Sequence, residues 1–221
     1  MSVTGLVLQD LGQGAVVATD CRGLSLSLLA RDIGRRVAAA AIRLVDCEGF
    51  DVDAEVVGVS GSAVTIEATQ DRSSPMAGRI ELRARGVQRA LTVLGRRDAP
   101  ASGLSGHIRA RDWSEAALLL SNVESVSFHL AMPDVADKPT LKINGAFGLR
   151  DSTVVLSWPG AEASGVLPDG MMVGGGETSG GTVIRTENQA FDDGEAPPSP
   201  VTETLLGLVG EAAGPGFRFY E

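Results

Sequence analysis

Short apolar runs that alternate with polar residues recur along the first hundred residues. In residues 24–28 three leucines alternate with two serines, and in residues 50–55 apolar side chains alternate with acidic ones. A period of two is typical of β-strands, whose successive side chains point to opposite faces of a sheet. The pattern therefore predicts strands with one buried face and one solvent-exposed face.

Turn residues separate these runs at intervals of roughly ten residues. Glu48-Gly49 and Ser60-Gly61 each stand between two strand-like runs, and Gly86 divides a third pair. We expect such turns to join antiparallel hairpins. The pattern predicts a mainly β protein, with a small antiparallel barrel or sandwich in residues 1–100.

The apolar phase of these strands predicts the core of the N-terminal domain. Side chains of this phase should be mostly buried. They are Leu26, Val52, Val56, Val64, Ile66, Ile80, Leu82, Leu91 and Val93.

A second β-rich domain is expected in residues 107–160, after a boundary within residues 96–106. It should contain a short helix near residues 113–121, because Asp112 could cap its N-terminus and Glu115 occupies the third position of a capping box. The apolar face of this helix would consist of Trp113, Ala116, Leu119 and Leu120.

Residues 161–200 are rich in Gly, Pro and acidic residues and predict a long irregular arm. A segment of this length without periodicity is disfavoured inside a compact domain, so we expect other chains to hold it. A second short helix is predicted over residues 201–213, ending before Gly214-Pro215.

Charge is divided unevenly along the 221 residues, whose net charge is −9. Residues 1–112 contain 14 basic and 13 acidic residues, whereas residues 113–221 contain 5 basic and 15 acidic residues. The acidic half argues against extended contact with nucleic acid. It is either a solvated surface or a surface that packs head to tail on the Arg-bearing half of a neighbour.

Two cysteines, Cys21 and Cys47, lie in no CxxC motif and have no nearby histidine in the sequence. A zinc site is therefore not expected, and a disulfide would require the two strands to be neighbours. The sequence begins without a signal-peptide pattern and contains no apolar run of about 18 residues. We expect free thiols and synthesis in a reducing cytoplasm, with no membrane span.

Two short motifs match the patterns of known binding or catalytic sites in part, and each lacks a residue that its pattern requires. Residues 175–182 have the spacing of a phosphate-binding loop, but Gly181 occupies the lysine position, so no nucleotide is expected. Residues 58–62 are similar to a nucleophile elbow, but Ser62 replaces its last glycine.

The titratable residues form no evident catalytic set. We place His107 in a loop and expect His129, in a strand-like run, to be a structural histidine. The acidic pairs Asp51/Asp53 and Asp192/Asp193 mark no pocket. No catalytic residue, cofactor or metal ligand is therefore predicted.

Arg31, Arg35 and Ser60 resemble the two-part motif of PilZ domains, which is R-x-x-x-R followed by [DN]-x-S-x-x-G. Gly58 and Ala63 depart from the second part. The resemblance implies a small barrel that binds cyclic di-GMP, with the two arginines clamping phosphates beside the serine.

Arg111, Asp112, Ser114 and Leu118 resemble a G-R-D-x-S-x-x-L phrase of tailed-phage tail hub proteins, although Ala110 replaces its glycine and Leu118 lies one residue beyond its leucine. In those proteins the phrase joins a strand to a short apolar helix. The resemblance implies a structural protein of the tail tip, the baseplate or a capsid-associated position.

Together these observations predict a non-enzymatic structural component of a large assembly, most plausibly a phage virion. Its partners would be copies of itself and other structural proteins of the same assembly, without nucleic acid. It would be made in the host cytoplasm and reside in the virion. The alternative is a degenerate PilZ-like domain in the bacterial cytoplasm, which binds a cyclic dinucleotide or serves as a protein-interaction module.

Overall fold

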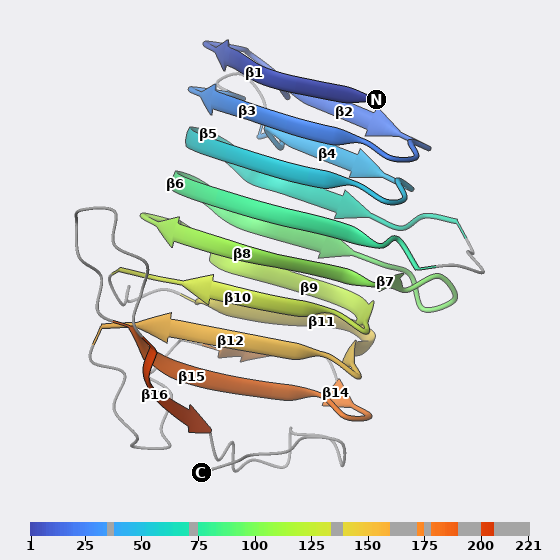
Figure 1. Ribbon diagram of the computed structural model, residues 1–221, viewed down its shortest axis with the longest axis vertical. Coiled ribbons are helices and arrows are strands. Elements are labelled where there is room, and N and C mark those ends of the chain that lie inside the picture. Colours follow the sequence, from blue (N-terminus) through green and yellow to red (C-terminus); the bar gives the residue numbers. More distant parts are fainter. Residues whose placement is uncertain are drawn as a thin grey trace.

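The chain folds into an all-β parallel solenoid of about six turns, so the predicted antiparallel barrel or sandwich is wrong (Figure 1). Strands of successive turns stack and pair in parallel, and β1 and β16 lie at opposite ends of the stack. The small barrel implied by the PilZ resemblance is wrong for the same reason. The computed structural model describes residues 1–34, 38–70, 75–133, 139–159, 172–174, 178–189 and 200–205.

One long side of the solenoid, face 1, is a ladder of strands that pair in parallel along the stack. The parallel order is β1 (Ser2–Gln9), β3 (Ser25–Arg31), the first half of β5 (Asp51–Glu67), the first half of β6 (Gly78–Leu94), β8 (Leu104–Arg111), β10 (Ser127–Ala131), β12 (Thr153–Trp158) and β15 (Val183–Gln189). A last strand, β16 (Pro200–Leu205), pairs with β15 and is antiparallel to it.

The opposite side, face 2, and a short third side complete each turn. Face 2 contains β2 (Val16–Thr19), β4 (Ile42–Val45), the second halves of β5 and β6, β9 (Ala116–Glu124), β11 (Leu141–Arg150) and β13 (Met172–Gly174). The third side contains β7 (Ala101–Ser102), β14 (Thr178–Ser179) and a bridge between Arg22 and Glu48.

The corners explain how so many short runs can stack without hairpins. Where the third side meets face 1, every turn has one residue with a φ of 48 to 69°. Gly adopts this left-handed conformation freely and Asp adopts it more readily than most residues, whereas Ala77 and Ser125 adopt it without such a preference. The column consists of Gly23, Gly49, Ala77, Gly103, Ser125, Asp151 and Gly180.

The predicted phase of the N-terminal strands is confirmed. All nine side chains predicted to form the core are buried, with exposed fractions of 0–3%. In register across the turns, Leu26 pairs with Val52 and Val52 pairs with Ile80. The same inward rows continue through Phe128 and Leu156 to Ile184, so one core runs the length of the solenoid.

The predicted helix near residues 113–121 is wrong, because β9 occupies Ala116–Glu124. Leu118 pairs with Leu91 on one side and with Leu141 on the other. Helix propensity is a weak preference, and ladder bonds to two flanking strands override it here. Among the described residues no helix is long and apolar enough to span a membrane.

The domain boundary that we predicted within residues 96–106 falls between the end of β6 and the first residues of β8. These two strands pair with each other in parallel and share one core. Within the predicted arm, β13, β14 and β15 belong to the solenoid. Residues 161–171, 175–177 and 190–199 of the arm and residues 206–213 of the predicted second helix lie outside the described residues, whereas residues 200–205 are strand β16.

Cys21 and Cys47 occupy neighbouring turns, since the Glu48 N–H donates to the Cys21 carbonyl at 2.7 Å. Both thiols are free. Burial raises the pKa of the Cys47 thiol, which therefore stays protonated at neutral pH.

Candidate functional site

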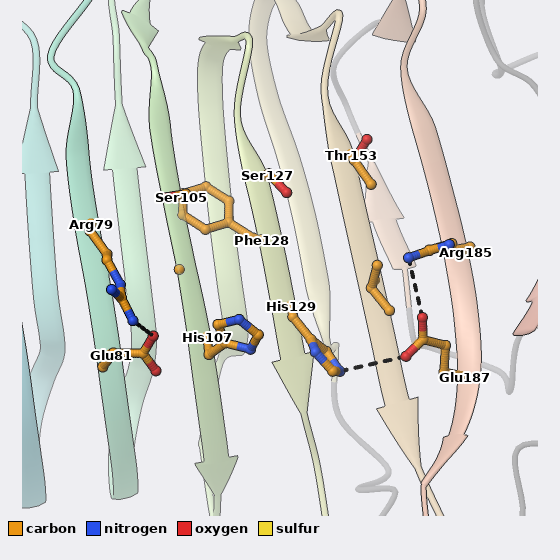
Figure 2. Close-up of a pocket in the computed structure, with 12 residues that line it drawn as sticks. Arg79, Glu81, Ser105, His107, Ser127, Phe128, His129, Thr153, Arg185 and Glu187 are labelled. Carbon is orange, nitrogen blue, oxygen red and sulfur yellow. Dashed lines mark hydrogen bonds and ion pairs between the residues drawn. The ribbon is translucent and has the colours of Figure 1, made fainter. Parts of the chain in front are cut away.

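A pocket of about 340 Å³ lies on the outer surface of face 1 (Figure 2). Its floor is a row of outward side chains in register across β6, β8 and β10, in the order Glu81, His107 and His129. Parallel strands place equivalent positions about 4.8 Å apart, so the side chains of one row are forced into contact. Arg185 and Glu187 of β15 close the far side of the pocket.

The two histidines form the centre of this pocket. Their ring centroids are 5.3 Å apart and the rings are tilted by 56°. A hydrogen bond of 2.8 Å joins His129 Nε2 to Ser157 Oγ. Glu187 Oε2 lies 4.0 Å from the same nitrogen, and Glu187 Oε1 pairs with Arg185 Nη2 at 3.3 Å.

The serine, histidine and glutamate of the pocket do not have the geometry of a catalytic triad. In a triad the carboxylate orients one ring nitrogen while the other nitrogen faces the hydroxyl. Here Ser157 and Glu187 both face Nε2 of His129, and Ser157 is fully buried, so a substrate could not reach its hydroxyl. The described part of the chain contains no group of three or more His, Cys, Asp or Glu side chains that could hold a metal ion.

His107 lies in β8, so the prediction that it is a loop residue is wrong. His129, predicted to be structural, hydrogen-bonds to Ser157 within the sheet. Burial lowers the pKa of His129, and the nearby His107 and Arg185 lower it further. The carboxylate of Glu187 does little to offset this lowering of the pKa, because it already pairs with Arg185.

This lowered pKa predicts how stability depends on pH. Below about pH 6.5 the unfolded chain binds a proton at position 129 that the folded chain resists, so stability should fall as the pH falls through that value toward the folded pKa. The substitution His129→Gln should reduce this acid-side loss. Thermal unfolding between about pH 7.5 and 5 measures it; equal losses in the two proteins would contradict the prediction.

A second pocket, of about 570 Å³, lies on face 2. Arg43 on its wall makes two hydrogen bonds of 2.7 Å to the carboxylate of Glu67. Next to this pocket Glu115 accepts hydrogen bonds from Arg89 and Lys142, and the Arg89 guanidinium is the main cause of the lowered pKa of Glu115. Because the charged side chains named here already pair with one another, this pocket offers no evident ligand site.

The structure describes two of the three residues of the PilZ resemblance, Arg31 and Ser60. Arg31 is exposed at the end of β3, opposite Val57 in the ladder, whereas Arg35 lies outside the described residues. The Ser60 hydroxyl donates to the Gly34 carbonyl, so it supports the turn that follows Arg31.

Both near-motifs of the sequence are parts of the solenoid wall. Gly180 is a corner residue, and the Gly181 N–H donates to Asp151 Oδ1 at 2.7 Å, so a carboxylate occupies the place that a phosphate would need. Ser62 lies within β5 and hydrogen-bonds to Thr92 at 2.9 Å. Asp51 and Asp53 face outward on β5, and Asp192/Asp193 lie outside the described residues.

The first turn of the solenoid differs from the rest of the described chain. The exposed large hydrophobic side chains of the described residues all belong to it: Met1 (82% exposed), Val7 (62%) and Val17 (63%). Inward residues such as Leu6 and Val16 are only partly buried, because no further turn covers them. Sequence reasoning missed this site, since β1 follows the same alternation as the interior strands.

The outer edges of β1 and β2 are unpaired among the described residues. Neither strand contains a charged residue or a proline, which proteins commonly use to protect sheet edges. The first turn therefore presents both open backbone groups and apolar side chains.

A scan against models of known protein families and searches of curated proteins and solved structures found no match for this chain.

Proposed function

We propose that the protein is a non-enzymatic structural component of a larger assembly and acts through contacts between chains. The observation that carries this proposal is the first turn, whose edges no described residue pairs or caps and which has a cluster of exposed apolar residues. Solenoid repeats need polar capping turns to remain soluble on their own. An end without one favours burial against another chain.

The two pockets support the same proposal. On face 1 His129 of β10 hydrogen-bonds to Ser157 of β12. On face 2 Arg43 pairs with Glu67 and Arg89 pairs with Glu115. These contacts join neighbouring strands of the stack and so hold successive turns together. A rigid, regularly paired rod suits a structural role.

The tail tip or baseplate of a phage virion is the setting that we propose for this assembly. It rests on the resemblance at Arg111, Asp112, Ser114 and Leu118. Asp112 is a corner residue with a φ of 52°, and Leu118 lies in β9. The helix of the tail hub phrase is thus replaced by strand, and the resemblance is confined to these four residues.

Sedimentation velocity of the purified full chain tests the proposal of assembly. Across about 1 to 100 µM, the range in which moderate interfaces form, the 22.8 kDa chain should associate reversibly into species of higher mass. A sedimentation coefficient that remains that of a 22.8 kDa monomer throughout would contradict the proposal.

A further inference from the structure

The open edge of β1 can pair with another strand through its regular part, Leu6–Gln9. A bulge at Gly5 interrupts the ladder between Val3 and Leu6, and pairing with β3 is continuous from Leu6 onward. The Asp10 N–H donates to the Arg31 carbonyl on the β3 side. Since N–H groups alternate along a strand, those of Val7 and Gln9 point to the open side.

The opposite end of face 1 is already occupied. There β16 pairs with β15 from Arg185 to Gln189, so the chain itself covers the outer edge of its last parallel strand. To continue the parallel ladder from one copy to the next, β1 would have to pair with the outer edge of β15, which β16 occupies in antiparallel orientation. Parallel head-to-tail continuation of the solenoid is therefore disfavoured on this face, which favours a head-to-head contact.

Charge and shape favour a second copy as the occupant of this edge. A two-fold antiparallel contact sets β1 of one copy against the same strand of the other, so a charged residue on β1 would lie opposite or diagonally across from a like charge. The strand contains none, from Ser2 to Gln9. The partly buried Leu6 and Leu8 continue the inward row of Leu28 and Ala30, so a second first turn would extend the same core.

We propose that two copies of the chain bind head to head through β1, as an antiparallel strand pair about a two-fold axis. Pairing that keeps inward side chains inward can place Val7 opposite Val7 of the partner subunit or opposite Gln9 of the partner subunit. The contact stops at a dimer, because a two-fold contact uses each first turn once. This inference rests on the proposed function, since it names the partner and surface of that assembly.

A charge-swap experiment at Val7 tests the pairing. The variants Val7→Lys and Val7→Glu should each raise the dimer dissociation constant by at least about tenfold, because each puts two like charges into an apolar contact. An equimolar mixture of the two should recover association, because lysine and glutamate then lie opposite or diagonally across from each other, within reach in either register. Ser105→Lys, an exposed outward position on the interior strand β8, is the matched control and should leave the constant unchanged.

Sedimentation velocity on the full-length proteins measures the wild type, the two Val7 variants, their mixture and Ser105→Lys, and circular dichroism checks that each variant is folded. If Val7→Lys associates as tightly as the wild type, the β1 contact is overturned while the proposal of assembly stands. Open-ended filaments of the wild type would overturn the closed head-to-head dimer. A monomeric wild type at every concentration would overturn both this contact and the proposed function.

Discussion

Replacing Trp113 with alanine is expected to lower the free energy of unfolding by about 3–5 kcal/mol, as for other large core aromatics. Trp113 is 1% exposed and is among the largest fully buried side chains. Its indole N–H donates to the Pro139 carbonyl at 2.9 Å, so it links the corner before β9 to the segment before β11. Truncation leaves both a cavity and an unpaired carbonyl.

The conservative variant Trp113→Phe separates these two losses. It retains most of the ring but removes the hydrogen bond to Pro139, so we expect a smaller loss of about 1–2 kcal/mol. Urea unfolding followed by far-UV circular dichroism measures both variants. A loss below about 1 kcal/mol for Trp113→Ala would mean that the residue is not enclosed in the core.

The substitution Gly95→Ala is expected to lower the free energy of unfolding by about 3 kcal/mol, at the upper end for overpacking. A Cβ at Gly95 would lie 2.3 Å from the Asn122 carbonyl oxygen and 2.4 Å from the Ala101 nitrogen. Both are backbone atoms of adjoining strands. Relief of the clash would therefore require the turns to separate, which ladder bonds such as Gly95 N–H to Ser121 O oppose.

Gly181→Ala is the matched control for this substitution. A Cβ there meets only Asp151 Oδ1, at 3.7 Å, and the residue does not have a left-handed φ. We expect a change within about 0.5 kcal/mol, measured by the same urea unfolding. Equal effects of the two substitutions would contradict the close stacking of turns at Gly95.

The buried and exposed phases of the strands could be predicted from the sequence. Alternation in residues 50–56 and 79–85 depends only on which side of one strand faces the core, and the structure confirms it. That information is local to each strand. It explains why the core of the N-terminal half was predicted correctly although its fold was not.

The direction of pairing could not be predicted in the same way. Gly58 and Gly86 have a φ of 67 and 61° and bend β5 and β6 from face 1 to face 2. A left-handed glycine also closes a hairpin, so the same residue serves an antiparallel and a parallel fold. Only the stacking of one corner on the next distinguishes them, and that is a contact between distant residues.

The repeat itself escaped detection because neither its length nor its corner residue is constant. Successive corners at Gly49, Ala77, Gly103 and Ser125 are separated by 28, 26 and 22 residues. A search for a fixed period fails on such a series. The outward positions vary freely as well, because solvent rather than a core faces them.

The candidate site at β1 is missed for a related reason. The alternation of apolar residues in residues 2–9 predicts a strand, but it does not say whether another strand covers its far edge. The absence of charge from β1 and β2 is the one signal in the sequence that could have marked this end. It acquires meaning only when the two strands are known to be the first of the stack.

Amide hydrogen exchange of the wild-type chain, measured below and above the dimer dissociation constant, tests the central claim most directly. The claim is that the protein assembles through its open first turn. We predict that association slows exchange in β1, including the open-side amides of Val7 and Gln9, while the interior strands β6 and β8 exchange at the same rate in both states. Exchange in β1 that is independent of concentration, or protection gained only elsewhere, would contradict the claim.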